Sequence, residues 1–419
     1  MAHINHSRRI HHLRTLSAQE AAAASQRGSF AAFCGVSQQR ILIALYEIRK
    51  FCGSMGGVLL HNDPQLESQL GGLYAIDGSS ERDFRIFLAN QANMQGVESF
   101  YDPLYGFSDN AILDLLAPFQ QSLPATAELR ALRSALADYL TIMRLRFEHD
   151  PGPFGNYPYN LDLLLELTSM PYTVLWNRVL SWLPSAARDE LASRLSAEGV
   201  QQIAYNAVLS FAQQLGGFLW TQRGFAGHSC LSTISAVRGR NFISIYIPES
   251  RADVLDFLAA ELQLLNNTRT PYLLMESGLN LNASPRMKQL FLSEHTELPY
   301  YTGILAEDTS GITNGELGKN DLTALFSQAQ EMFIFACSST MAAQPFSDGI
   351  GTYYRLVQER HTDTMREPLH LFSSHGSGTV QHEALQHTVT AEELTNLGIG
   401  CLLYGRNYPV PVIVDRFTF

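Results

Sequence analysis

Ser229 is the first residue of the sequence whose surroundings suggest nucleophilic chemistry. Residues 227–231 are Gly-His-Ser-Cys-Leu, which nearly matches Gly-x-Ser-x-Gly, the strained turn that exposes the nucleophile of α/β-hydrolases. The second glycine, which lets strand and helix pack closely in that turn, is replaced by Leu231, and no strongly apolar strand comes before it. A polar loop is therefore favoured here, and a hydrolase acting through Ser229 is kept as an alternative.

Histidines recur near the C-terminal end of the chain, at spacings that suggest metal binding. His370 and His375 lie five residues apart, as do His382 and His387, but no cysteine or carboxylate stands at ligand spacing beside them. Residues 374–379 are Ser-His-Gly-Ser-Gly-Thr, a glycine-rich run with no lysine after it. We predict a flexible connection at 374–379 and no metal site.

The charge balance argues against a protein that binds nucleic acid over its whole surface. The formal net charge of the 419 residues is −11, so any such contact would be local. Arg238-Gly239-Arg240, with Arg223 nearby, is the one candidate patch that we single out. A solvated loop is the favoured interpretation of this patch, and a weak nucleic-acid contact at Arg238 and Arg240 is a secondary hypothesis.

Composition indicates a globular protein from a reducing compartment. Hydrophobic residues make up 46% of the chain and charged residues 16%, and the five cysteines are dispersed without paired spacing. No apolar run reaches the roughly 18 residues that a membrane span needs. Residues 1–29 begin with a basic stretch that lacks the apolar segment of a secretion signal. We expect a flexible basic tail there and a cytoplasmic protein.

The N-terminal third contains a β-α-β pattern. Residues 30–34 form a short apolar run, residues 38–51 carry apolar residues at helical spacing, and residues 58–60 are apolar again. Such a unit requires the two strands to be parallel, because the helix carries the chain back across the sheet. From about residue 112 to residue 225 the spacing is helical almost throughout.

The second half returns to alternating strands and helices. We expect strands at 242–247, 272–275, 300–305, 332–336, 401–404 and 410–414, and helices at 252–265, 287–293 and 322–330. This order predicts an α/β fold with a doubly wound, mostly parallel sheet. The predicted divisions of the chain are 1–29 (tail), 30–111 (first part of the α/β domain), 112–235 (all-α insertion) and 236–419 (second part of the α/β domain).

Several weak motifs occur in the order found in one known family. The chain resembles the RecA-like domain of the coupling ATPases of conjugation and type IV secretion, the TraG/TraD type. The segments that carry the resemblance are 100–106, 242–247, 271–277, 290–301, 332–337 and 390–397. The resemblance implies a RecA-like fold, a nucleotide site at the turn after residue 34, and a cytoplasmic place beside an inner-membrane secretion complex.

The residues at that turn depart from what nucleotide binding requires. A P-loop has the sequence Gly-x-x-x-x-Gly-Lys-Ser/Thr, in which glycines let backbone N–H groups surround the phosphates, lysine neutralises them and the hydroxyl holds Mg²⁺. Here Gly35 is the one glycine left, followed by Ser37, and Gln39 or Arg40 stands in place of lysine. The chain has three lysines, and none of them follows a glycine-rich turn. We therefore predict a vestigial site.

The acidic positions implied by the resemblance depart as well. Met275 stands where the family has the aspartate that orders Mg²⁺, while Glu276 is kept beside it. Glu307 stands at the position of the sensor glutamine, where a carboxylate would repel a γ-phosphate. We predict no catalytic residue, cofactor or metal for this chain.

Two classes of function remain open at this point. The first, which we favour, is a pseudo-ATPase: an adaptor or structural subunit that keeps the fold and docks conjugation or secretion proteins, including an active coupling ATPase. The second is an enzyme, either a divergent NTPase or DNA-translocating motor or the hydrolase at Ser229. The adaptor function rests on analogy with a fold.

Overall fold

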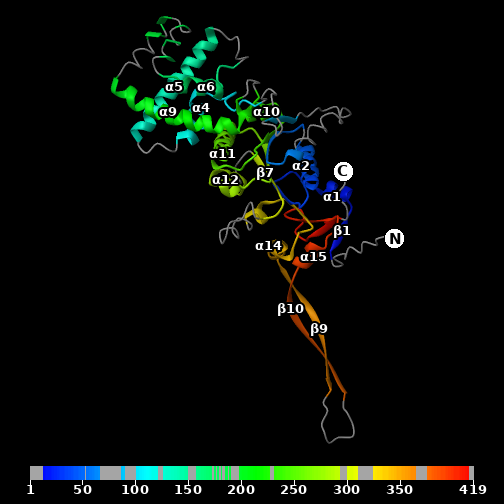
Figure 1. Ribbon diagram of the computed structural model, residues 1–419. Helices are drawn as coiled ribbons and strands as arrows, with labels where there is room; N and C mark the ends of the chain where they lie inside the picture. The colour runs from blue at the N-terminus through cyan, green and yellow to red at the C-terminus, as the bar shows by residue number, and fades with distance from the viewer. Residues whose placement is uncertain are drawn as a thin grey trace, which may run out of the picture.

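The computed structural model is built around one ten-stranded sheet (Figure 1). It describes residues 13–51, 53–66, 86–89, 101–120, 126–149, 157–171, parts of 174–189, 198–226, 231–292, 300–309, 324–364 and 375–414. The strands of the sheet are β1 (Arg14–Leu16), β2 (Phe30–Phe33), β3 (Gly56–His61), β4 (Ile86–Ala89), β5 (Phe242–Tyr246), β6 (Tyr272–Ser277), β7 (Tyr300–Ala306), β8 (Glu331–Phe335), β11 (Cys401–Tyr404) and β12 (Val412–Val414). Their order across the sheet is β1-β12-β11-β8-β2-β7-β6-β3-β5-β4.

The sheet is parallel except around β11. β2 pairs parallel with β7 and β8, and the run β7-β6-β3-β5-β4 is parallel throughout. β11 pairs antiparallel with β8 and with β12, so the strands expected at 401–404 and 410–414 form a closing hairpin. β2 lies inside the sheet, so the turn that follows it opens at the carboxyl edge between neighbouring strands. The predicted α/β class with a doubly wound and mostly parallel sheet is confirmed.

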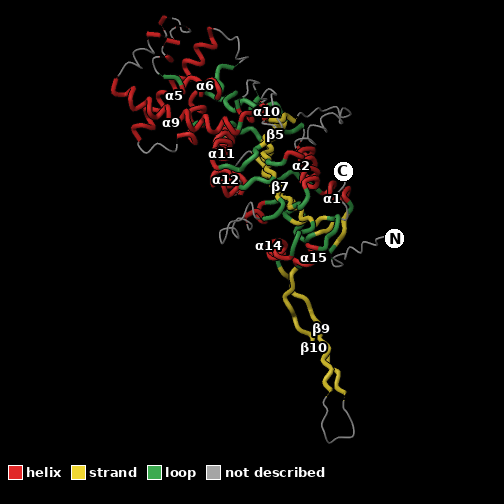
Figure 2. The backbone as a smooth tube through the Cα atoms, in the orientation of Figure 1, coloured by secondary structure: helices red, strands yellow, loops and turns green. Residues whose placement is uncertain are grey.

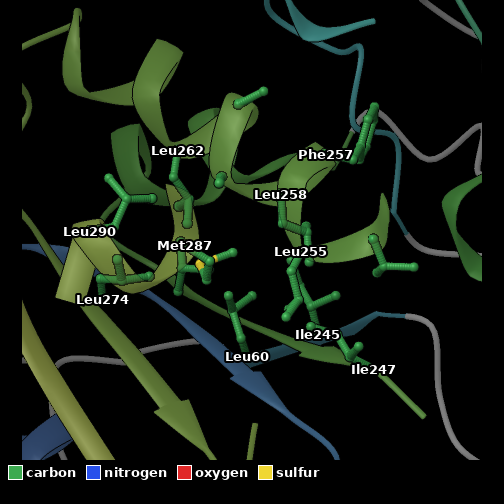
Figure 3. Packing of buried hydrophobic residues seen from close by; sticks show 14 of the residues in the cluster. Leu60, Ile245, Ile247, Leu255, Phe257, Leu258, Leu262, Leu274, Met287 and Leu290 are labelled. Atoms are coloured by element: carbon green, nitrogen blue, oxygen red, sulfur yellow. The ribbon is translucent and has the colours of Figure 1, made fainter. Parts of the chain in front are cut away.

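Helices cover both faces of the sheet. Its central strands are therefore apolar at successive positions, because the side chains on either face are buried. On one face α2 (Ser37–Phe51) packs Ile41, Ile48 and Phe51 into a cluster with Leu59 and Met275. The other face is covered by α10 (Thr233–Arg238), α11 (Ala252–Asn266) and α12 (Pro285–Leu292). Figure 3 shows Leu255, Leu258 and Leu262 of α11 above Leu60, Ile245 and Leu274 of the strands.

A group of helices lies between β4 and β5 in the chain and projects from one end of the sheet (Figure 2). It contains α4 (Asp109–Leu115), α5 (Thr126–His149), α6 (Leu161–Ser169) and α9 (Glu198–Thr221). Aromatic rings attach it to the sheet layer: the centroids of Phe119 and Phe218 lie 5.4 and 5.1 Å from that of Phe257 on α11. The helical character expected here is present, whereas the predicted domain boundaries remain predictions.

The prediction of a flexible connection at 374–379 is wrong. Residues 375–379 belong to β10 (His375–His387), which pairs antiparallel with β9 (Thr352–Thr364) along its whole length. This ribbon leaves the core between α14 (Thr340–Ile350) and α15 (Ala391–Thr395). Glycine and serine indicated a loop, but cross-strand pairing stabilises these residues as a strand.

The flexible tail predicted for residues 1–29 is wrong for residues 14–24. β1 pairs parallel with β12, and α1 (Ala18–Ala24) begins with a capping box between Ser17 and Glu20. Residues 1–12 lie outside the described residues. No helix in the described part of the chain is both long and apolar enough to cross a membrane.

Candidate functional site

The turn from β2 into α2 opens at the carboxyl edge of the sheet, where open α/β sheets bind ligands. Two backbone groups that flank this turn are bonded within the fold: the N–H of Cys34 donates to Ala306 O at 2.8 Å, and the N–H of Gln39 donates to Val36 O at 3.0 Å. Gly35 has no positive φ and is exposed, with open space where a Cβ would lie. A P-loop ends with a second glycine followed by lysine, and residues 36–40 contain neither.

The side chain of Arg40 lies across this turn. Its Nη1 is 3.4 Å from the carbonyl oxygen of Cys34, and its Nη2 is 3.5 Å from Oδ2 of Asp63, in the segment after β3. Only 15% of the Arg40 side chain and 12% of the Asp63 side chain are exposed. The one cation of the turn is thus directed at protein groups.

Met275 and Glu276 lie at the carboxyl end of β6 and point to opposite faces of the sheet. Met275 is fully buried in the apolar cluster under α2, so its position offers no oxygen to a metal ion. Glu276 is buried on the other face, where its Oε2 accepts the N–H of Leu279 at 3.0 Å. Burial raises the pKa of Glu276 to about 8, although the hydrogen bond from Leu279 and the charge of Arg40 act in the opposite direction.

Glu307 follows the end of β7 and is exposed at the same edge. Neither lysine that the structure describes supplies a cation to this edge. Lys50 lies at the far end of α2, with its Nζ 2.8 Å from both Glu47 and Glu331, and Lys288 of α12 donates to Asn282 Oδ1 at 2.9 Å. Lys319 is outside the described residues.

A polar spot that the sequence did not reveal lies beside Arg40. His61 at the end of β3 is paired in register with Ser277 of β6, and Ser244 of β5 lies on the same face. His61 Nδ1 is 3.0 Å from the carbonyl oxygen of Asp63, which can only accept, so Nδ1 carries the proton and Nε2 is an acceptor. Among the described residues, His61 Nε2 and the hydroxyls of Ser277 and Ser244 find no hydrogen-bond partner.

This polar spot is neutral. Burial lowers the pKa of His61 to about 4, so the imidazole carries no charge near neutral pH. A neutral imidazole and two hydroxyls can hold a bridging water molecule but cannot balance the charge of a triphosphate. The only sequence signals for the spot were the polar residues at the ends of β3 and β6 and one serine inside β5, and a single sequence does not separate these from ordinary polar residues.

The structure therefore brings together Gly35, Gln39, Arg40, Glu276 and Glu307 at one edge of the sheet, as the resemblance implied, while Met275 is turned into the core. Ser37 begins α2 at the same edge. Within the described residues no group of three His, Cys, Asp or Glu side chains could hold a metal ion. In the described part of this edge, the guanidinium of Arg40 is the one cation that we find at the turn, and it is already paired with Asp63.

The candidate nucleic-acid patch lies away from the β2–α2 turn. Arg238 and Arg240 are exposed near the amino edge of the sheet, on the side away from the turn, and Arg240 donates to Gly53 O at 3.5 Å. Ser229 is outside the described residues, so the hydrolase alternative stays a prediction.

No protein-family model matches the chain, and no curated protein resembles it in sequence. Solved structures that resemble it include the bacterial conjugative coupling protein TrwBdeltaN70 in complex with sulphate, at 10% identity and TM-score 0.47 over 97% of this chain and 94% of that chain. The unbound monoclinic form of the same protein gives 11% identity and TM-score 0.48 over 97% and 89%. VirB4 of Thermoanaerobacter pseudethanolicus gives 12% identity and TM-score 0.43 over 77% and 82%. With identities this low and TM-scores below 0.5, these similarities assign no activity, ligand or partner to this chain.

Proposed function

We propose that this chain is a pseudo-ATPase module of a conjugation or type IV secretion machine, which acts by docking other proteins and does not turn over nucleotide. One observation carries the proposal: Arg40 occupies the turn after β2 and is directed at Cys34 O and Asp63 Oδ2. A nucleotide would have to displace this internal contact and would find no second cation behind it.

The electrostatics of the site support this proposal. A nucleoside triphosphate with its Mg²⁺ needs several positive groups and at least one oxygen ligand from the protein. The edge offers the paired guanidinium of Arg40 against the carboxylates of Asp63 and Glu307. Transfer of the γ-phosphoryl group depends almost entirely on positioning the reacting groups and neutralising the phosphate charge. A site that can do neither has lost the basis of catalysis.

The proposed setting comes from the order of sequence motifs between residues 100 and 397. The proposed partners are conjugation or secretion proteins, including an active coupling ATPase, and the proposed location is cytoplasmic, beside an inner-membrane secretion complex. A weak nucleic-acid contact at the exposed Arg238 and Arg240 is a subordinate part of the proposal.

Calorimetric titration and thermal shift with Mg²⁺-ATP test the proposal. We expect no heat of binding and no change in Tm at millimolar ATP for the unmodified protein. We also expect none for Arg40→Lys, because one lysine does not restore the Mg²⁺ ligand. Arg49→Lys, the same exchange at the exposed far end of α2, is the matched control.

A rise in Tm of several degrees would contradict the proposal. Such a rise means ligand well above its Kd, since stabilisation reaches about 2.7 kcal/mol at one hundred times the Kd. Binding that Arg40→Lys changes but Arg49→Lys does not would place a working nucleotide site at this turn.

A further inference from the structure

Arginines line the amino edge of the sheet, where the parallel strands begin. We call five exposed members the arginine row: Arg27, Arg238, Arg240, Arg269 and Arg406. Arg27 precedes β2 and Arg269 precedes β6, while the pair at 238 and 240 lies just before β5. Arg406 follows β11, which runs antiparallel to β8 and therefore ends at this edge. The row is at the opposite edge of the sheet from the β2–α2 turn.

The fold does not neutralise the arginine row. Glu47 and Glu331 lie near the same edge, but both are buried and contact Lys50. Within the described residues, no carboxylate forms an ion pair with a member of the row. This edge is therefore locally positive on a chain whose net charge is −11.

Two members of the row are held by the nitrogen nearest their aliphatic chain. Arg27 Nε donates to the carbonyl oxygen of Lys50 at 2.8 Å, and Arg406 Nε donates to that of Ser327 at 2.8 Å. A guanidinium that is fixed through Nε keeps Nη1 and Nη2 for a second acceptor group. The row is thus partly preorganised for planar, two-oxygen acceptors such as carboxylates.

Two other members have an unusual backbone conformation. Arg240 and Arg269 have φ of 56° and 54°, and no other described residue except glycine has a positive φ. They follow α10 and α11, at the place where a helix commonly has glycine because a Cβ is unfavourable in this conformation. A helix end favours a nearby cation, but it does not require that the cation be the left-handed residue itself. We take the two strained arginines as a sign that their side chains are used.

The row is long and narrow. From β11 to β5 the strand order is β11-β8-β2-β7-β6-β3-β5, so the row crosses six strand spacings of about 4.8 Å, or about 29 Å in all. An extended polypeptide rises about 3.3 Å per residue, so about nine residues cover this length. An extended ligand fits such a row better than a compact one.

We propose that the arginine row docks an extended acidic segment of a partner protein, about nine residues long, whose carboxylates pair with the guanidinium groups. Clusters of arginines recognise acidic motifs in this way, because the planar guanidinium binds both oxygens of a carboxylate. The proposal rests on the proposed docking function and names the chemistry of one partner.

Nucleic acid fits this edge less well. Surfaces that bind single strands combine cations with aromatic side chains on which the bases stack. Among the described residues, Tyr301 of β7 is the exposed aromatic residue at this edge, and its ring already packs on Phe51 with 5.4 Å between centroids. The net charge of −11 also opposes a long polyanion that extends beyond the row.

Fluorescence anisotropy with labelled nonaglutamate and the full-length protein tests the proposal. We expect saturable binding that weakens as salt is added, because exposed charges are screened. Labelled tetraglutamate covers less than half of the row and should bind at least tenfold more weakly. A nine-residue oligothymidylate and phosphatidylglycerol vesicles are the competing probes, and each should bind at least tenfold more weakly than nonaglutamate.

A glycine variant separates binding from folding. Arg240→Gly/Arg269→Gly removes two guanidinium groups and places glycine where φ is positive, so Tm should stay the same or rise. The Kd for nonaglutamate should rise about tenfold. Arg223→Gln/Arg286→Gln, which removes two exposed arginines outside the row, is the matched control and should leave the Kd unchanged.

Three results would overturn the proposal. The first is no saturable binding of nonaglutamate at about 100 µM protein and low salt, where micromolar affinity would be saturated. The second is an equal Kd for the glycine variant and the unmodified protein. The third is an oligothymidylate or vesicle affinity that matches that of nonaglutamate, which would assign the row to nucleic acid or to a membrane surface.

These assays contain no nucleotide, so the two proposals fail separately. Loss of peptide binding in a protein that also binds no ATP would leave the pseudo-ATPase proposal in place and remove this docking surface. Binding of ATP together with row-dependent peptide binding would remove only the pseudo-ATPase proposal.

Discussion

Arg40 is the residue on which the chemistry of the β2–α2 turn depends. A guanidinium is planar and binds best where two acceptors lie in its plane, whereas a lysine ammonium is a compact point charge that fits between phosphates. The 3.4 and 3.5 Å distances to Cys34 O and Asp63 Oδ2 show that the fork of Arg40 is directed at groups of the protein.

The buried Glu276 should make stability depend on pH. Its folded-state pKa of about 8 lies above the ordinary 4.5, so between these values the folded state holds a proton that the unfolded state releases. The free energy of unfolding should therefore fall as pH rises from 4.5 to 8. Glu276→Gln keeps an acceptor for Leu279 N–H and should reduce this loss by on the order of 1–3 kcal/mol in urea titrations.

The remaining pH dependence of that variant has other sources. Burial also raises the pKa of Glu47 to about 8 and that of Glu261 to about 7, so a slope of the same sign persists. Glu307→Gln, at the exposed position, is the control. Equal slopes for Glu276→Gln and the unmodified protein would mean that Glu276 is ionised in the fold.

At the scale of the elements, two glycines show which part of the β-α-β unit is constrained. A Cβ at Gly57 of β3 would lie 2.6 Å from the Phe242 ring and 2.8 Å from the carbonyl oxygen of Leu273, so the close approach of β5 and β6 requires glycine there. At Gly35 there is open space and no positive φ. The glycine of the strand is needed for packing, whereas the glycine of the turn is not.

Alanine substitutions should separate these two positions. Gly57→Ala should lower the free energy of unfolding by about 1–3 kcal/mol, because ring and backbone must move to admit a methyl group. Gly35→Ala should change it by less than about 0.5 kcal/mol. Urea titrations of both variants measure this, and a large loss for Gly35→Ala would mean that the turn needs glycine after all.

At the scale of the whole molecule, Lys50 joins parts of the chain that are far apart in sequence. Its Nζ lies 2.8 Å from Glu47 Oε1 on the same helix and 2.8 Å from Glu331 Oε2 at the start of β8. Glu331 also accepts from the hydroxyl of Ser25 at 2.9 Å and from Nδ2 of Asn407 at 3.0 Å. One buried network thus connects α2, β8 and segments near both ends of the described chain.

Removing the ammonium of Lys50 should affect the whole fold. Lys50→Met leaves the buried carboxyl groups of Glu47 and Glu331 without their shared partner and should lower the free energy of unfolding by about 3–5 kcal/mol. Lys288→Met, which loses the hydrogen bond from Nζ to Asn282 Oδ1, should cost about 1 kcal/mol. Comparable losses for the two variants would show that the Lys50 network contributes little.

Local pattern predicted the sheet core well and the ribbon poorly. Residues 30–60 and 242–306 alternate long apolar runs with amphipathic helices, and such strong periodicity survives in the tertiary structure. β9 and β10 contain threonine, glutamine, histidine and glycine with few apolar residues, so their strand structure comes from pairing with each other. β1 is only three residues long and forms because β12 lies beside it.

The sequence by itself determined that the pattern Gly-x-x-x-x-Gly-Lys-Ser/Thr is absent, because glycine spacing and the position of lysine are local properties of a few consecutive residues. Only the tertiary structure decided which groups surround the turn after β2. Asp63 reaches Arg40 because parallel strands bring their carboxyl ends to one edge, and Met275 faces α2 because side chains alternate across β6. Lys50 meets Glu331, 281 residues away, because the order of strands places β8 beside β2. Contacts of this kind depend on which strands are neighbours, and no short stretch of sequence contains that information.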